Sequence, residues 1–179
     1  MKTFGYFLER KYERKDIGDK WLSLEFGMNK QSIINEMLKD CQYMYHIAPS
    51  KYDNRIEKSG LVPRNNNVLY EYPGRIYLFE CENINGEEVT DLTEADFKMP
   101  VRFLYSEKKK TNNNYVDDNK FSIWRIQVQD ILHKVNFCLD ISQETIELLG
   151  NCFFISLYTE DNIPPFTIEK LFSIDLSSR

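Results

Sequence analysis

The residues of this chain best suited to chemistry lie around two short apolar segments. His46 lies near the end of the apolar run 43–47, shortly before a proline-containing turn, and the chain has only one other histidine. Tyr77 lies inside a second apolar run, residues 75–81, with Arg75 at its start. Side chains at strand ends line clefts more often than side chains at strand centres. We therefore expect a ligand site built around His46.

Structural roles for the same residues stay open. His46 could be a strand-end histidine satisfied by a backbone hydrogen bond, and Tyr77 could be a buried strand tyrosine. Gly60 stands where the C-cap glycine of a helix belongs. His133 follows an apolar pair without any motif, which favours a structural or surface role.

The elements that must position these residues can be read from periodicity and turn signals. A helix is expected over 50–59, with Ser50 as N-cap and Gly60 as C-cap. A short helix is expected over 91–97, and the polar stretch 106–120 is interpreted as a loop. Strands are expected at 43–47, 75–81, 121–128, 135–139, 152–158 and 168–176, and a brief strand or turn at 101–105. Helices gather in the first third and strands follow, which favours an α+β fold.

The bulk composition excludes several classes of protein. The chain has 179 residues, of which 42% are hydrophobic, which suits a single domain with a real core. Its net charge of −5 argues against generic binding to a nucleic-acid backbone. It has no run of about 18 apolar residues for a membrane span. Charges come too early at the N-terminus for a signal peptide, so a cytoplasmic location is expected.

The four cysteines, Cys41, Cys81, Cys138 and Cys152, have no short pair spacing. With only two histidines they make no recognisable metal-ligand set, so free thiols and no metal are expected. Alanine is nearly absent while asparagine, lysine, isoleucine and tyrosine are plentiful. This bias suggests an AT-rich genome such as that of a bacteriophage.

A family resemblance joins these segments. A strand with His at 45–49, a helix leading to the Gly-Leu pair at 60–61, and the Gly-Arg-Ile-Tyr-Leu sequence at 74–78 follow one another. This order and spacing resemble the opening of ADP-ribosyltransferase-like folds. The resemblance continues through 124–128, 153–155 and 162–165, and it covers about residues 43–176.

The resemblance implies a mixed, split β-sheet that encloses a cleft for NAD, which is a substrate. It implies an ADP-ribosyltransferase-like domain at 43–179, which would follow a helical extension at 1–42. His46 would hydrogen-bond the ribose on the nicotinamide side, Tyr77 would stack on the nicotinamide ring, and Arg75 would contribute to cofactor binding. ADP-ribose would pass to an acceptor, macromolecular or not, that the sequence does not identify.

The third functional position of the family is a glutamate near the start of the strand before the Pro-Pro turn. Here Asn151 or Cys152 is nearest to that position, and Glu147 is the nearest carboxylate. A carboxylate suits the position because positive charge develops on the sugar in the transition state. Glu147 is therefore the candidate catalytic residue.

The same residues are compatible with two alternative functions. One is a catalytically degenerate module that binds a nucleotide or a protein, for example an accessory protein of a phage or mobile element. The other is an enzyme similar to RNA 2′-phosphotransferases, in which Arg75 and Arg125 would surround the phosphate.

Overall fold

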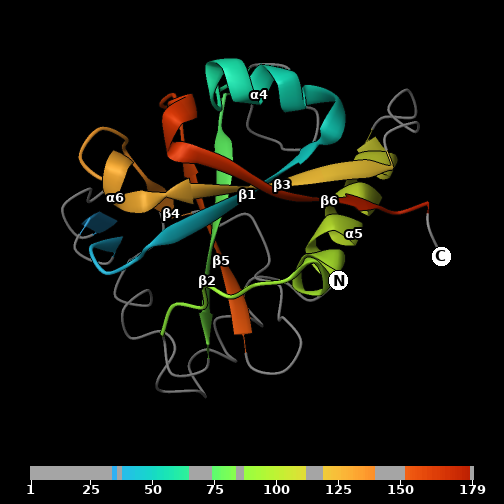
Figure 1. Ribbon diagram of the computed structural model, residues 1–179, viewed down its shortest axis with the longest axis horizontal. Helices are drawn as coiled ribbons and strands as arrows, with labels where there is room; N and C mark the ends of the chain where they lie inside the picture. Colours follow the sequence, from blue (N-terminus) through green and yellow to red (C-terminus); the bar gives the residue numbers. More distant parts are fainter. Residues whose placement is uncertain are drawn as a thin grey trace.

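The computed structural model describes residues 34–35, 38–64, 74–83, 87–111, 119–139 and 152–177 (Figure 1). Within these residues, one six-stranded sheet has the strand order β4-β5-β2-β1-β3-β6. The strands are β1 (Tyr43–Pro49), β2 (Ile76–Asn83), β3 (Lys120–Gln127), β4 (Cys138–Leu139), β5 (Cys152–Thr159) and β6 (Ile168–Asp175). The helices are η1 (Ser50–Tyr52), α4 (Asp53–Ser59), α5 (Glu94–Thr111), α6 (Val128–Ile131) and η3 (Pro165–Thr167). The fold is therefore α+β, as predicted.

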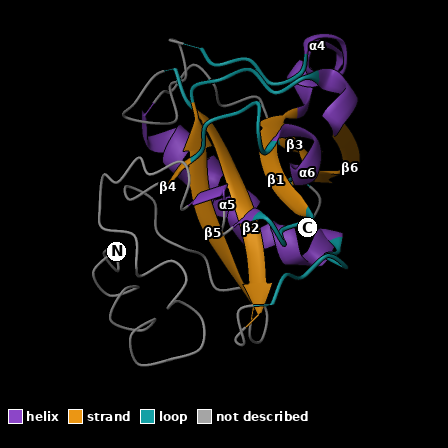
Figure 2. Cartoon of the chain, turned by 90° about the vertical axis from the view of Figure 1, so that its left-hand side faces the viewer, coloured by secondary structure: helices purple, strands orange, loops and turns teal. Residues whose placement is uncertain are grey.

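The sheet consists of two halves joined at one point. β2 pairs with β5 along its whole length, and β1 pairs with β3 along its whole length. β1 and β2 share only one registered pair, Tyr45 with Phe79. Figure 2 shows β2 with β5 and β1 with β3 as two separate groups of strands. We call the place where β1 and β2 separate beyond this pair, toward Tyr77, the split.

Every strand pairing in the described residues is antiparallel. The mixed sheet expected from the resemblance therefore differs from the observed one, because none of these pairs is parallel. The resemblance also implied a split sheet. In the observed sheet, β1 and β2 are joined by only one registered pair.

The central strand β1 is buried on both faces, which creates two cores. Met44 and Ala48 belong to a first core that also contains Ile56 of α4. Tyr45 and Ile47, which alternate with them, belong to a second core together with residues of α5. Because side chains alternate along a strand, α4 and α5 cover opposite faces of β1. The nearly continuous apolar sequence of β1 follows from this double burial.

Helix α5 is much longer than the short helix predicted at 91–97. The brief strand or turn predicted at 101–105 and the first part of the loop predicted at 106–120 both lie within it. Phe97, Val101 and Leu104 are buried at helical spacing against the second core. Burial of this stripe outweighs both the β-type residues of 101–105 and the internal Pro100.

The helix expected at 50–59 is observed as η1 followed by α4, and Gly60 is its C-cap, as predicted. The predicted N-cap role of Ser50 is wrong. Its hydroxyl instead hydrogen-bonds the hydroxyl of Ser122 on β3 at 2.8 Å. The Ser122 hydroxyl on the neighbouring strand competes here with the backbone of the first helical turn for the Ser50 side chain.

Parts of the predictions fall outside the described residues. Of the predicted extension 1–42, only 34–35 and 38–42 are described, and Ile34, Leu38 and Cys41 pack in the first core. Cys41, Cys81 and Cys138 are free thiols, as expected. No helix in the described ranges is long and apolar enough to cross a membrane.

Candidate functional site

His46 is placed by β1 at the edge of the split. The residues from Met44 to Pro49 are buried, except that His46 is partly exposed. It alternates with Tyr45 and Ile47, so it lies on the face of the first core. Trp124 of β3 is its direct cross-strand partner on that face. The indole Nε1 of Trp124 is buried and finds no hydrogen-bond acceptor among the described residues.

The His46 ring is held in one tautomer. Its Nδ1 lies 2.8 Å from the carbonyl oxygen of Tyr77. A carbonyl can only accept, so Nδ1 carries the proton and donates it. Burial lowers the pKa of His46 below its usual value, although this hydrogen bond opposes the shift. The ring is therefore neutral at pH 7, and Nε2 keeps a lone pair that can accept a hydrogen bond.

The expectation that His46 and Tyr77 face one cleft is wrong. Tyr77 alternates with Ile76 and Leu78, whose side chains belong to the first core. Its own side chain therefore lies on the other face, where it contacts the ring of Tyr158 at a centroid distance of 6.3 Å. The two residues meet only because the His46 ring reaches the Tyr77 backbone. The period of two along each strand gives the two side chains opposite directions.

Arg75 lies on the Tyr77 side of the sheet. Its guanidinium stands over the ring of Tyr158 at 3.9 Å and contacts the exposed Glu160 at 3.5 Å. It also interacts electrostatically with Tyr77. Burial raises the pKa of Tyr158 to about 12, so the ring under the guanidinium stays neutral. The three predicted cofactor-binding residues thus meet through Tyr77, whose carbonyl binds His46 and whose side chain neighbours Arg75.

Glu147, the candidate catalytic residue, and the neighbouring Asn151 lie outside the described residues. The sequence reasoning missed another carboxylate, Glu80 of β2, whose exposed fraction is only 1%. The Glu80 side chain lies on the same face of β2 as Leu78. His46 lies on this face of the sheet as well. A glutamate between the apolar residues Phe79 and Cys81 was the signal that could have singled it out.

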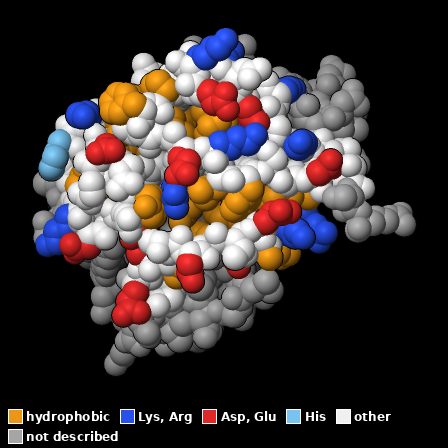
Figure 3. Space-filling view, in the orientation of Figure 1, with side chains coloured by type: hydrophobic (Ala, Val, Ile, Leu, Met, Phe, Trp, Pro, Cys, Tyr) orange, Lys and Arg blue, Asp and Glu red, His pale blue; other side chains and the backbone are white. Residues whose placement is uncertain are grey.

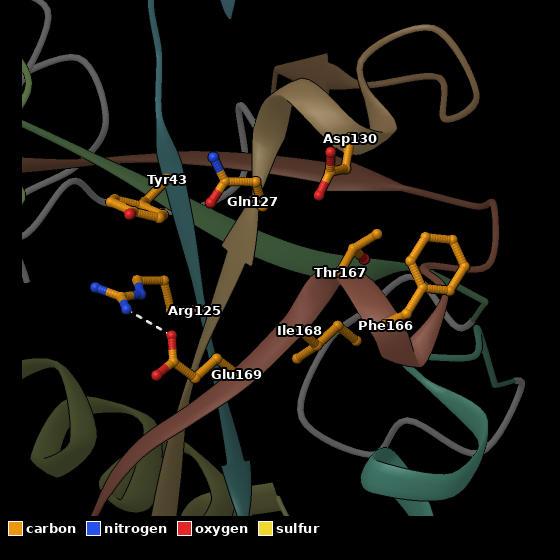
Figure 4. Close-up of a pocket in the computed structure, with 8 residues that line it drawn as sticks. All are labelled: Tyr43, Arg125, Gln127, Asp130, Phe166, Thr167, Ile168 and Glu169. Atoms are coloured by element: carbon orange, nitrogen blue, oxygen red, sulfur yellow. Dashed lines mark hydrogen bonds and ion pairs between the residues drawn. The ribbon is translucent and has the colours of Figure 1, made fainter.

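A second polar cluster surrounds Arg125 on β3. Its guanidinium stands over the Tyr43 ring at 4.4 Å and forms an ion pair with Glu169 of β6 at 2.5 Å. Both residues line a hollow of about 400 Å³, together with Asp130 and Phe166. Figure 4 shows Asp130 and Phe166 across this hollow from the ion pair. Arg75 and Arg125 therefore belong to separate clusters, each with its own carboxylate and aromatic ring.

The described residues hold no group of three or more histidine, cysteine, aspartate or glutamate side chains that could bind a metal ion. No family model matches the sequence, and no curated protein or solved structure shows significant similarity to it. The functional argument therefore rests on the site residues themselves.

Proposed function

We propose that this protein is ADP-ribosyltransferase-like and binds NAD, or a related nucleotide, at the split between β1 and β2. The observation that carries the proposal is the state of His46. It is the partly exposed residue of a buried stretch, it is neutral, and Nδ1 is occupied by the Tyr77 carbonyl. Nε2 can then accept a hydrogen bond from a ribose hydroxyl, the role that the family resemblance gives to this histidine.

Two further observations support a ligand at this place. The backbone pairing between β1 and β2 ends beside His46, because the two strands share only the pair of Tyr45 and Phe79. The buried Nε1 of Trp124 is a donor without an acceptor among the described residues, and it lies on the same face as His46. Unsatisfied buried donors are rare in folded proteins, and a ligand oxygen would satisfy this one.

The remaining residues have less direct roles. Arg75 carries a positive charge that suits the phosphate oxygens of a dinucleotide, although Glu160 offsets part of it. The Tyr77 ring is not assigned to stacking beside His46, since it lies on the other face. Its backbone carbonyl fixes the His46 tautomer instead.

Transfer of ADP-ribose would break the bond between the nicotinamide nitrogen and the ribose carbon. Nicotinamide would leave as a neutral molecule, and a nucleophile of the acceptor, or water, would attack the sugar and lose its proton. The positive charge that develops on the sugar needs a fixed carboxylate. Glu147 is the residue proposed for this role.

A thermal-shift measurement combined with an assay of nicotinamide release tests the proposal. We expect NAD to raise the melting temperature and nicotinamide to appear with time. Glu147→Gln should slow the release by roughly 10²-fold or more while leaving the thermal shift intact. Full release by Glu147→Gln would contradict the catalytic assignment. The absence of any thermal shift in the unmodified protein would contradict NAD binding itself.

A second candidate function is binding of a nucleotide without turnover. The position of the Tyr77 ring favours binding without turnover. The resemblance implies that this ring stacks on nicotinamide, but the ring lies on the face opposite His46. A thermal shift with NAD and no nicotinamide release would support this alternative. An activity similar to RNA 2′-phosphotransferases has less support, because both Arg75 and Arg125 already contact carboxylates.

A further inference from the structure

We propose that the basic face of η1 and α4 binds a phosphate or diphosphate group carried by a small molecule. The basic face consists of Lys51, Arg55 and Lys58, with Arg64 just beyond the end of α4. The proposal does not depend on NAD binding at the split. It rests on the separation of charge around the helix, on two arginines without an ion pair, and on the contacts that place Arg64.

The charged residues of η1 and α4 separate by sign. Lys51, Arg55 and Lys58 are exposed and follow one another at intervals of four and three residues, so they share one face of the helix. Each residue turns the helix by about 100°, which puts Asp53 and Glu57 on the opposite face. Like charges at intervals of three or four residues destabilise a helix. An anion bound to the basic face would offset this repulsion.

The carboxylates of the helix do not neutralise the basic face. The Asp53 carboxylate already contacts Lys170 at 2.6 Å and the Ser122 hydroxyl at 2.9 Å. Arg55 and Arg64 form no ion pair within the described part of the chain. The whole chain has a net charge of −5, so this local excess of positive charge runs against the overall composition.

Positive charges gather around the ring of Tyr52. The ring packs against the first core, and it has Lys51 Nζ at 5.2 Å and Arg64 Cζ at 5.9 Å from its centroid. Burial lowers the pKa of Arg64, and the nearby charge of Arg55 lowers it further, although Tyr52 opposes the shift. Arg64 therefore lies close to two other cations, and phosphate oxygens beside it would remove the repulsion.

The backbone around Arg64 is fixed on both sides. Leu61 forms an isolated bridge with Ile163, and the carbonyl oxygen of Arg64 accepts a hydrogen bond from the Gly74 N–H at 2.8 Å. The chain thus leaves the end of α4 and still brings the Arg64 side chain back to Tyr52, near the start of the same helical segment. The cluster of cations is a product of the fold and does not follow from the sequence of the helix alone.

The surroundings favour a small ligand over a nucleic acid. In Figure 3, basic side chains lie along the upper edge of the molecule, where α4 runs in Figure 1, and acidic side chains lie just below them. A polynucleotide carries a negative charge at every nucleotide, so its backbone would meet these acidic side chains. A single phosphate or diphosphate needs only the basic face, and guanidinium groups match its oxygens with paired hydrogen bonds.

Calorimetric titration of inorganic pyrophosphate into the full chain, at constant ionic strength, tests the proposal. Arg55→Gln and Arg64→Gln should each weaken binding by about fivefold or more. Arg102→Gln, which removes an exposed arginine of α5, is the matched control and should bind as the unmodified protein does. His46→Gln should also bind pyrophosphate unchanged, which separates this site from the split.

A melting experiment without pyrophosphate tests the charge imbalance itself. Arg55→Gln should keep or raise the melting temperature, because it relieves repulsion and breaks no ion pair. A clear decrease in this variant would mean that Arg55 has a structural role and would contradict the imbalance.

Three binding results would overturn the proposal. The first is no binding of pyrophosphate to the unmodified protein. The second is equal weakening by Arg64→Gln and Arg102→Gln, which would indicate attraction to positive charge in general. The third is binding of oligothymidylate that is tighter than that of pyrophosphate and is lost in Arg64→Gln, which would assign the basic face to nucleic acid. None of these results bears on NAD binding at the split.

Discussion

At the scale of single residues, the structural role of His46 is compatible with the function proposed for it. The hydrogen bond from Nδ1 to the Tyr77 carbonyl links β1 to β2 just beyond their single registered pair. The same bond fixes which nitrogen can face a ligand. The two readings that the sequence left open, a satisfied strand-end histidine and a ligand contact, are therefore compatible.

His46 should make the stability of the protein depend on pH. Its pKa is lowered in the folded state by burial, so below about pH 6.5 the unfolded chain binds a proton that the folded protein resists. The free energy of unfolding should therefore be highest above this pH and decrease as the pH falls toward the lower pKa of the folded state. Urea unfolding between pH 7.5 and pH 5 measures this dependence.

The decrease should be smaller in His46→Gln than in the unmodified protein. His133→Gln is the matched control, because His133 is the other histidine of the chain and is exposed. It should retain the full dependence on pH. Equal dependence in His46→Gln and the unmodified protein would show that other groups cause the decrease.

The sequence predicted which residues lie near Tyr77, but not on which face of the sheet each side chain lies. Apolar runs and a histidine before a turn were enough to place His46 and Tyr77 on strands that prove to be neighbours. The direction of each ring depends on the register of the two strands, and a shift of one residue would reverse it. No local pattern in the sequence fixes that register.

At the scale of elements, Gly60 holds the end of α4 against the turn before β6. Its φ is 72°, a region that favours glycine, and its N–H caps the helix by bonding Ile56. A Cβ at this position would lie 2.0 Å from the carbonyl oxygen of Ile163 and 2.9 Å from the nitrogen of Pro165. The glycine is therefore required for a close approach as well as for the cap.

Gly60→Ala should lower the free energy of unfolding by about 1–3 kcal/mol or more, because it adds both strain and a clash. Lys58→Ala, an exposed change in the same helix, is the control and should have little effect. Urea denaturation measures both variants. A stability unchanged by Gly60→Ala would contradict the close packing of α4 on the turn that carries Phe166.

A polar network ties α4 to β3 and β6 at the other end of the helix. The hydroxyl of Ser122, itself fully buried, donates to Asp53 at 2.9 Å, and Lys170 forms an ion pair with the same carboxylate at 2.6 Å. Ser122→Ala should cost about 1–2 kcal/mol of stability, because Asp53 loses a partner in a partly buried place. Ser59→Ala, exposed at the end of α4, is the control in the same denaturation experiment. A loss no larger than that of the control would show that the network adds no stability.

Most strands could be predicted from the sequence. The exceptions are explained by tertiary packing. The predicted strands at 43–47, 75–81, 121–128, 152–158 and 168–176 are all observed with small differences at their ends. Alternation and apolar runs carry enough information for strands of this kind. Helix α5 was missed beyond residue 97 because its stripe is recognisable only once the second core that buries it is known.

At the scale of the whole molecule, the division of the sheet is the central feature. Two three-stranded halves meet at one residue pair, and each face of β1 has its own core and its own helix. The backbone pairing between the two halves ends beside His46, whose ring bonds the Tyr77 carbonyl at 2.8 Å. The hollow of about 400 Å³ lies elsewhere, between β3 and β6.

The most direct test of the central claim is calorimetric titration of NAD into the unmodified protein, His46→Gln and the control His133→Gln. The account predicts that the unmodified protein and His133→Gln bind NAD with the same affinity. His46→Gln should bind it about threefold to tenfold more weakly, because a hydrogen bond to the ribose is lost. No binding to the unmodified protein, or equal affinity in His46→Gln, would contradict the claim that NAD binds at the split through His46.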